Sequence, residues 1–171
     1  MTKTLWERFN TVRLVSLATL GSAGLLAGAF MFQALGYAPC DLCLLQRWPH
    51  VAAVLIGGAM LSLPLPRIFA LFGAAAAATS GAIGIYHSGV ELHIFEGPDS
   101  CTSNGVANLS VDELMAQING APLVRCDEIT WQIFGLTMAN MNVLLSFGLA
   151  LVWILAFLHA HKGAAAAYRE D

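Results

Sequence analysis

Two cysteines three positions apart, Cys40 and Cys43, are the residues of this chain whose type and spacing most directly suggest chemistry. A C-x-x-C pair can close a redox-active disulfide or supply half of a metal site. If the segment is helical, Arg47 lies one turn beyond Cys43 on the same face, which places its guanidinium near the sulfur. A neighbouring cation and a helix N-terminus both favour the thiolate, the form of cysteine that exchanges disulfides. The pattern therefore indicates thiol redox chemistry, with a metal site as the alternative.

Two further cysteines, Cys101 and Cys126, lie in a long polar stretch at about 88–140. Four cysteines allow three pairings. In an oxidising compartment, where disulfides persist, the four residues can form two structural staples or two exchanging disulfides. A zinc site is the third interpretation, but Cys101 and Cys126 lack the close spacing that a second ligand pair shows in structural zinc sites. The compartment that the cysteines face therefore bears on the choice.

The composition is that of a membrane protein, because 57% of the 171 residues are hydrophobic and only 11% are charged. A helix needs about 20 mainly apolar residues to cross the hydrocarbon core. Four stretches have this length or nearly so: 14–36, 44–63, 68–86 and 141–160. The first is longer than the apolar region of a signal peptide, so we expect it to be retained. The sequence thus predicts one membrane domain, an all-α polytopic four-helix bundle.

The distribution of basic residues predicts how this bundle is oriented. Only Arg47 and Arg125 lie on the other face; the remaining lysines and arginines gather at the two termini and in the turn between the second and third stretches, as Lys3, Arg8, Arg13, Arg67, Lys162 and Arg169. Short cytoplasmic segments are enriched in lysine and arginine, so both termini are expected in the cytoplasm. A short first loop at about 37–43 and the long second loop at about 88–140 then lie outside, and all four cysteines with them.

Small residues predict where helices approach one another closely. Gly24 and Gly28 form a G-x-x-x-G motif in the first stretch, which we interpret as a packing contact rather than a functional one. Gly73, Ala77 and Gly81 follow one another at four-residue spacing in the third stretch. Both faces are expected to pack against neighbouring helices.

The start of the second helix decides how Arg47 is interpreted. The helix matches the membrane thickness only if it begins near Leu44, which puts Arg47 within one turn of the membrane surface. The guanidinium can then reach to the interface, as charged residues at helix ends do, or lie beside Cys43. Pro49 leaves the local geometry open, because a proline inside a helix introduces a kink.

The long second loop carries two local signals. Ser110-Val111-Asp112-Glu113 has the form of a capping box and predicts a short amphipathic helix that stops at Asn119-Gly120. A second apolar patch follows, made of Trp131, Phe134, Leu136 and Met138. We expect this patch to lie in the membrane interface and to hold the loop down.

Three motifs, in this order, resemble those of the bacterial disulfide bond formation protein B (DsbB) family. The first is Pro39-Cys40-Asp41-Leu42-Cys43 with Gln46-Arg47; the second is Tyr86-His87-Ser88-Gly89-Val90-Glu91 followed by Gly97-Pro98-Asp99-Ser100-Cys101; the third is Arg125-Cys126-Asp127-Glu128, leading into Trp131 and Gly135-Leu136-Thr137-Met138-Ala139. Each motif is weak alone, but the ordered set within a four-helix frame is specific. The resemblance covers nearly the whole chain.

The resemblance implies a quinone-dependent thiol oxidase of the bacterial inner membrane. Its substrate is expected to be a soluble periplasmic protein with a thioredoxin fold, of the DsbA type, and its cofactor a membrane quinone, ubiquinone or menaquinone. Cys101 would form the mixed disulfide with the partner, and Cys126 would complete the loop disulfide. Cys40 and Cys43 would be the pair that quinone re-oxidises.

By the same resemblance, Cys43 is the sulfur that meets the quinone, Arg47 positions or polarises the quinone ring, and His87 lies near it. A cation beside a reduced quinone would stabilise its negative charge by electrostatic preorganisation. For His87, an interfacial polar cap at the end of the third helix is the other interpretation. We assign no role to Asp41, His50 or His93.

The alternative function is a structural or transport four-helix membrane protein whose cysteines are staples or zinc ligands. A proton or ion path would need acidic residues inside the membrane stretches, and those stretches lack them. We therefore predict a redox enzyme with catalytic residues Cys40, Cys43, Cys101 and Cys126, quinone-binding residues Arg47 and His87, no metal, and no nucleic-acid partner.

Overall fold

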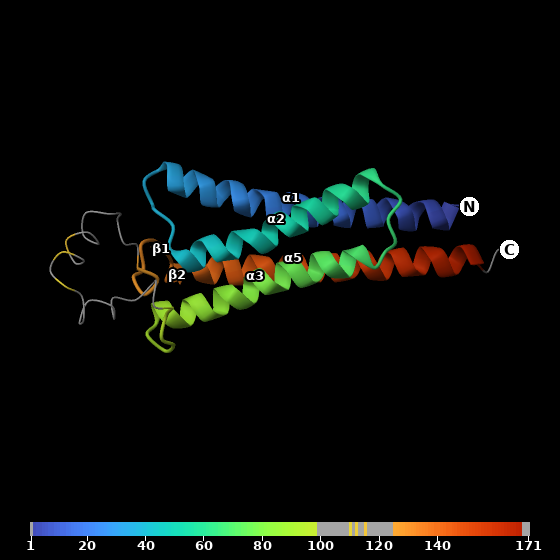
Figure 1. Ribbon diagram of the computed structural model, residues 1–171. Helices are drawn as coiled ribbons and strands as arrows, with labels where there is room; N and C mark the ends of the chain where they lie inside the picture. The colour runs from blue at the N-terminus through green and yellow to red at the C-terminus, as the bar shows by residue number, and fades with distance from the viewer. Residues whose placement is uncertain (1, 99–109, 111, 113–114, 116–124, 169–171) are drawn as a thin grey trace.

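The computed structural model describes residues 2–98, 110, 112, 115 and 125–168. The described part consists of four long helices and one short hairpin: α1 Thr2–Ala34, α2 Asp41–Ser62, α3 Phe69–Glu91, β1 Gln132–Ile133, β2 Leu136–Thr137 and α5 Met138–Tyr168. The helices run lengthwise side by side, and α1 begins at the same end of the bundle as α5 finishes (Figure 1). The predicted all-α four-helix bundle is confirmed.

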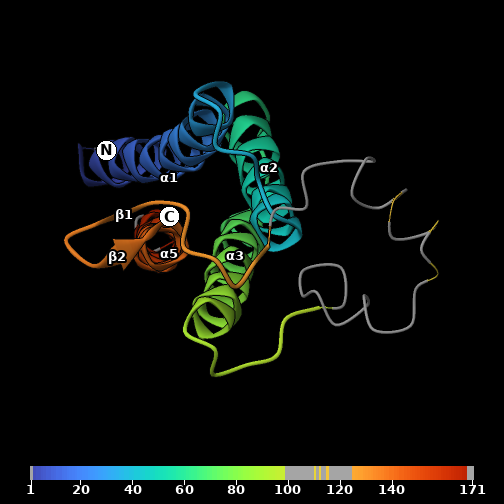
Figure 2. The same cartoon turned by 90° about the vertical axis from the view of Figure 1, so that its left-hand side faces the viewer.

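Each helix packs on two neighbours, so that the bundle has the cyclic order α1, α2, α3, α5. Seen from the end at which α2 begins, the antiparallel hairpin β1–β2 lies across the start of α5 (Figure 2). The centre of the bundle is made of small side chains around one large one, Trp153, which is fully buried. Small residues allow the helix axes to approach closely where no hydrophobic force drives them together in lipid.

Three helices contain stretches that are long and apolar enough to cross a membrane: Phe9–Ala34, Phe69–Glu91 and Met138–Ala160. The 22-residue helix α2 is not among them. Its first half carries Gln46, Arg47 and His50, and these polar side chains lower its hydropathy. The helix with the weakest membrane signal therefore still carries two buried polar side chains, Gln46 and His50, into the bundle.

All four helices are longer than the apolar stretches predicted, and α5, at Met138–Tyr168, extends beyond both ends of the predicted 141–160. Helix α1 extends from Thr2, so the segment before residue 14 continues the same helix. Helix α3 continues to Glu91 rather than ending at about residue 86. This extension puts His87 and Glu91 one turn apart on one face of α3.

The small face predicted for the third helix is confirmed. A Cβ atom added to Gly73 would lie 2.6 Å from the indole ring of Trp153, and one added to Gly81 would lie 2.8 Å from the ring of Phe147. Both rings belong to α5. The absence of side chains at these two positions of α3 therefore makes room for aromatic rings of the neighbouring helix.

The packing contact predicted for Gly24 and Gly28 is wrong. Apart from the nearby backbone of α1 itself, no heavy atom of the described residues lies within 4 Å of a Cβ atom built on either residue. A pair of glycines removes side-chain volume, and in this part of α1 the volume stays open instead of being filled by a neighbouring helix. Both residues border the cavity described below.

The second loop differs from expectation where it is described. The helix predicted after Ser110 lies mostly outside the described residues. The predicted apolar patch is divided: Trp131 packs edge-on against Phe32 of α1, with ring centroids 5.1 Å apart, whereas Phe134 is 97% exposed. Phe134 and Gly135 both have positive φ, 51° and 78°, which is the backbone of a tight hairpin turn. The turn aims Phe134 away from the bundle.

Candidate functional site

Cys40 and Cys43 occupy the N-terminus of α2. Cys40 caps the helix, and its sulfur accepts a hydrogen bond from the backbone N–H of Cys43 over 3.2 Å. The thiol of Cys40 in turn donates to the sulfur of Cys43, with the two Sγ atoms 2.7 Å apart. Both cysteines are free thiols, Cys40 buried and Cys43 half-buried. The predicted placement of the pair at the start of a helix agrees with this geometry.

The two thiols differ in acidity. The hydrogen bond donated by Cys40 lowers the pKa of Cys43 and outweighs burial, which raises it. The pKa of Cys40 is raised, first by its hydrogen bond to Cys43 and then by burial. Arg47 also lowers the pKa of Cys43, as expected, but it contributes less than Cys40 does. When this pair loses one proton, Cys43 is therefore the residue that loses it, and Cys40 keeps its hydrogen.

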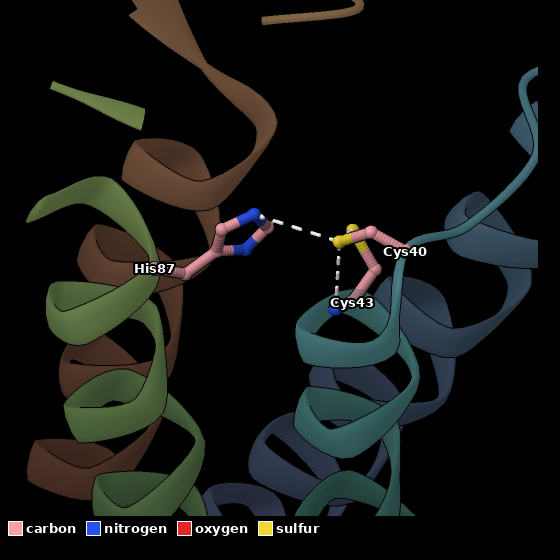
Figure 3. Close-up of side chains that lie close together, drawn as sticks. All are labelled: Cys40, Cys43 and His87. Carbon is pink, nitrogen blue, oxygen red and sulfur yellow. Dashed lines mark hydrogen bonds between the residues drawn. The ribbon is translucent and has the colours of Figure 1, made fainter. Parts of the chain in front are cut away.

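His87, near the end of α3, faces this pair across the bundle (Figure 3). Its Nε2 atom lies 3.6 Å from Cys40 Sγ, and the side chain is buried. One turn further along α3, a carboxylate oxygen of Glu91 lies 4.0 Å from the same nitrogen. The other oxygen of Glu91 accepts a hydrogen bond of 2.6 Å from Thr137. The structure thus places His87 beside the buried sulfur of Cys40. A polar cap at the membrane interface would not need this contact.

A second set of polar side chains lies deeper in the bundle and connects α2, α3 and α5. Gln46 contacts Nδ1 of His87 at 2.8 Å and accepts a 2.7 Å hydrogen bond from the side chain of Asn142. Asn142 also contacts His50, whose Nε2 lies 3.2 Å from its oxygen. Ser80 and Ser146 complete the set through their hydroxyl groups. Burying polar groups in an apolar bundle costs free energy unless they are hydrogen-bonded, and most of these groups are hydrogen-bonded.

Cys126 is buried in the same cluster of side chains as Cys40, Leu42 and Val90. It is bonded in a disulfide. The preceding residue, Arg125, makes a two-pronged ion pair with Asp127, with distances of 2.9 Å and 2.6 Å. Cys126 therefore lies next to the C-x-x-C pair. The sequence alone did not reveal this proximity. Cys101 lies outside the described residues, and its role stays a prediction.

A cavity of about 230 Å³ opens beside the dithiol. Its lining comes from all four helices and from the segment before the hairpin, and includes Gly24, Gly28, Cys43, Arg47, His87 and Trp131. The remaining lining is mainly apolar, with Gln46, His50 and Asn142 at one side. Of the two free sulfurs, Cys43 borders the cavity and Cys40 does not.

Arg47 lines this cavity and contacts α1. It donates a 2.9 Å hydrogen bond to Gln33, and its guanidinium carbon lies 4.9 Å from the centre of the Phe30 ring. Its Nε atom is buried and has no partner among the described residues, and the same holds for Nδ1 of His50. Two nitrogens without a hydrogen-bond partner among the described residues thus belong to side chains that line the cavity.

The sulfur atoms of Cys40 and Cys43 and a nitrogen of His87 lie within 4.8 Å of one another, which is close enough to consider a metal. Two thiolates on one tetrahedral zinc ion lie about 3.7 Å apart, given zinc–sulfur bonds of about 2.3 Å. The sulfur–sulfur distance of 2.7 Å is well below that value. The arrangement suits a dithiol that closes to a disulfide better than a zinc site.

Several residues of the site were not predicted as functional. Gln46 and Glu91 appeared only within motifs, His50 was given no role, and Asn142 was not selected. A signal existed for Gln46, His50 and Asn142, because each is a polar residue inside or next to an apolar stretch. What the sequence does not reveal is that they contact one another.

The fold and site define a multi-pass helical membrane protein with a buried dithiol beside a cavity. The family model described as DsbB, Disulfide bond formation protein DsbB, matches residues 11–156. The chain therefore belongs to the DsbB family, as its motifs indicated, and membership implies a role in disulfide bond formation.

The chain is similar to three proteins at low identity. It is 27% identical over 151 residues to Disulfide bond formation protein B of Dechloromonas aromatica (strain RCB), covering 84% of this chain and 90% of that protein. It is 24% identical over 148 residues to the uncharacterized protein RP370 of Rickettsia prowazekii (strain Madrid E), covering 85% and 86%. It is 23% identical over 149 residues to Disulfide bond formation protein B of a Polaromonas species (strain JS666 / ATCC BAA-500), covering 84% and 88%. No solved structure matches significantly.

Proposed function

We propose that this protein is a thiol:quinone oxidoreductase that re-oxidises a DsbA-type periplasmic dithiol protein and passes the electrons to membrane quinone. The observation that carries the proposal is the position of Cys43. Its sulfur is the more acidic of the free pair, and it borders an apolar cavity lined also by Arg47 and His87. Its hydrogen-bonding partner, Cys40, packs in one cluster with Cys126.

The thiol steps of the proposal balance without any further reagent. The two thiols of the partner are oxidised to a disulfide while a disulfide between Cys101 and Cys126 is reduced, with Cys101 as the residue attacked. The resulting pair of loop thiols then reduces a disulfide between Cys40 and Cys43 by the same exchange chemistry. Two electrons and two protons arrive at Cys40 and Cys43 in each round. Contact between Cys126 and the Cys40 cluster supports this order.

The cavity fits the head group of a quinone by size and by chemistry. An apolar cavity of about 150 Å³ holds a benzene ring, so about 230 Å³ accommodates a ring with substituents. Arg47 would hold a ring oxygen, since it lines the cavity and its Nε is unpaired among the described residues, and His87 would lie beside the ring because it lines the same cavity. Gly24 and Gly28 keep the space open. When bound, the quinone supplies the two-electron oxidation that closes the Cys40–Cys43 disulfide.

The orientation proposed for the enzyme puts the cysteines on the periplasmic side. The turn between α2 and α3 lies toward the end of the bundle at which α1 begins, and the start of α2 lies with the hairpin at the opposite end (Figure 1). Arg13 belongs to the first half of α1 and Arg67 to that turn, whereas Cys40 and Cys43 belong to the start of α2. A surplus of basic residues marks the cytoplasmic side. The thiols would therefore meet a soluble partner in a compartment where disulfides persist.

Filling the cavity tests the proposal without touching a sulfur. Gly28→Leu introduces a side chain at a cavity-lining position, whereas Gly58→Leu introduces the same side chain at a position that is equally open among the described residues but does not line this cavity. We expect Gly28→Leu to raise the apparent KM for quinone about tenfold or more, which corresponds to about 1.4 kcal/mol, and Gly58→Leu to leave it unchanged. Turnover of a reduced DsbA-type protein in membranes, with quinone varied, gives both values.

The same assay tests the thiol chemistry. Oxidation of the partner should require quinone, and Cys43→Ser should abolish it while the protein still inserts in the membrane. Undiminished turnover by Cys43→Ser, or stoichiometric zinc in a protein that oxidises no thiols, would contradict the proposed function. An unchanged KM in Gly28→Leu would contradict only the assignment of the cavity.

A further inference from the structure

The hydrogen bonds between Asn142, Gln46 and His87 determine which way each side chain is turned. The Nδ2 atom of Asn142 lies 3.3 Å from the backbone oxygen of Ser80. A backbone carbonyl can only accept a hydrogen bond, so the group facing it must be the NH₂ of the asparagine. The hydroxyl of Ser80 donates to the backbone oxygen of Gln46 over 3.0 Å, which leaves its lone pairs to accept from the same NH₂ group at 3.2 Å. The orientation of Asn142 is therefore fixed by its surroundings.

The orientation of Gln46 follows from that of Asn142. The NH₂ group of Asn142 donates to Gln46 over 2.7 Å, so the atom that accepts must be the side-chain oxygen Oε1. The NH₂ group of Gln46 then faces Nδ1 of His87 at 2.8 Å. An amide NH₂ only donates, and Nδ1 must accept with its lone pair. The proton of a neutral His87 is thereby placed on Nε2.

The surroundings of Nε2 lead independently to the same tautomer. Cys40 Sγ lies 3.6 Å from Nε2, and the single hydrogen of that thiol is directed at Cys43. The second neighbour is a carboxylate oxygen of Glu91 at 4.0 Å, and the carboxylate already accepts from Thr137. Both of these neighbours are acceptors, and the backbone of Cys126 makes a further hydrogen bond with the His87 ring. Nε2 is therefore the donor. The two sides of the ring agree.

We propose that Gln46, held in place by Asn142, is a positioning residue that makes His87 a hydrogen-bond donor toward the sulfur of Cys40. With the opposite tautomer, Nε2 would present a lone pair and act as a base toward the Cys40 thiol. As a donor, His87 stabilises negative charge on Cys40, whereas the Cys40 thiol stabilises negative charge on Cys43. Cys43 still ionises first, and the hydrogen bond from His87 favours charge on Cys40 whenever Cys40 gives up its hydrogen. The inference deepens the proposed function by naming how the dithiol is tuned, but its test needs neither quinone nor partner.

The tautomer can be read directly. Nitrogen NMR of the full-length, reduced protein in nanodiscs, with labelled histidine and His87→Gln to assign its signals, distinguishes a protonated ring nitrogen from an unprotonated one. We expect wild-type His87 to show a protonated Nε2 and an unprotonated Nδ1. A wild-type His87 protonated on Nδ1 alone, or on both nitrogens, overturns the proposal.

Two substitutions test whether Gln46 and Asn142 set the tautomer. In Gln46→Glu the carboxylate accepts where the amide donated, so Nδ1 should become protonated. In Asn142→Leu the donor that orients Gln46 is lost, so the Nδ1 signal should shift toward the protonated form. Gln132→Glu, which makes the same change on the exposed strand β1, should leave both signals at their wild-type positions.

The outcomes separate this inference from the proposed function. An unprotonated Nδ1 in Gln46→Glu, identical to that of the wild type, means that Gln46 does not control His87 and overturns the inference. The same spectra remain valid if the protein proves unable to oxidise thiols with quinone. Loss of quinone-dependent turnover therefore contradicts the proposed function alone, and an unaltered tautomer contradicts the positioning role alone.

Discussion

The thiol of Cys40 donates a hydrogen bond to the sulfur of Cys43 across 2.7 Å. Two chemically identical thiols at one helix end therefore differ in role, since one is the donor and the other the acceptor. Cys40 is the buried cap of α2, while Cys43 borders the cavity. The difference in burial and the direction of the hydrogen bond act together, since both keep the proton on Cys40. The sulfur open to a small molecule is therefore the one that ionises first.

The first prediction concerns this hydrogen bond. Cys40→Ala removes the donor, so the lowered pKa of Cys43 should return toward its ordinary value, and the pH at which Cys43 becomes alkylated should move upward. Cys40→Ser keeps a hydroxyl donor at the cap and should give a smaller upward shift. Because Cys43 reacts as the thiolate, the reaction is fast above its folded-state pKa and slow below it. The pH profile of iodoacetamide labelling of the reduced protein measures the shift.

Cys40→Ala and Cys40→Ser both abolish the dithiol. A difference between their alkylation profiles therefore reports the hydrogen-bond donor and not the loss of the second thiol. Identical alkylation profiles for Cys40→Ala, Cys40→Ser and the wild type would show that the thiol hydrogen bond does not lower the pKa of Cys43. The remaining influences, the helix N-terminus and Arg47, would then account for its reactivity.

The second prediction separates binding of quinone from thiol exchange. Arg47 stacks on Phe30 and bonds Gln33, and it contributes little to the acidity of Cys43. Arg47→Ala should therefore raise the apparent KM for quinone by about tenfold or more, and leave the rate at which the loop disulfide exchanges with the reduced partner within about twofold. Steady-state turnover gives the first quantity, and rapid mixing without quinone gives the second.

Arg47→Lys is the matched control for charge. A lysine keeps the cation but lacks the planar fork that bonds Gln33 and stacks on the ring. An intermediate KM is expected for Arg47→Lys. Equal losses in quinone use and in exchange would instead assign Arg47 a structural role.

The elements of this fold were largely predictable, because a membrane helix is specified by one long apolar run. The small face of α3 was also predictable, since Gly73, Ala77 and Gly81 at four-residue spacing indicate close packing against a neighbouring helix. The same reasoning failed for Gly24 and Gly28. Small residues permit a close contact, but only the position of the neighbouring helix decides whether the space is filled or left as a cavity.

The polar part of the site was predictable only in fragments. Cys40, Cys43 and Arg47 are close in sequence, and helix geometry relates them directly. Gln46 and Asn142 are 96 residues apart, so their hydrogen bond depends on which helices are adjacent and at what depth. The hairpin was missed for a different reason: two-residue strands are too short to show any alternation, and Phe134-Gly135 was its only turn signal.

The third prediction concerns the contact that ties the hairpin to α3. Thr137 donates a 2.6 Å hydrogen bond to the buried carboxylate of Glu91 and accepts one from the backbone N–H of Asn140 at the start of α5. Thr137→Val preserves the shape of the side chain but removes both bonds, which leaves a buried carboxylate without this donor. A hydrogen bond to a charged group contributes about 1.5–3 kcal/mol, and loss of a cap costs about 1 kcal/mol. We expect Thr137→Val to lower the free energy of unfolding by about 2–4 kcal/mol.

Thr137→Ser keeps the hydroxyl and should lose less than about 1 kcal/mol, because a single methyl group is removed. Reversible unfolding in mixed micelles, followed by tryptophan fluorescence, compares the two variants with the wild type. Glu91→Gln adds a check on the mechanism: with the carboxylate already replaced, Thr137→Val should cost less than it does in the wild type, since the two residues act through one bond. If the cost of Thr137→Val is the same in both backgrounds, the hydroxyl stabilises only the start of α5, and Glu91 is held near His87 by α3 alone.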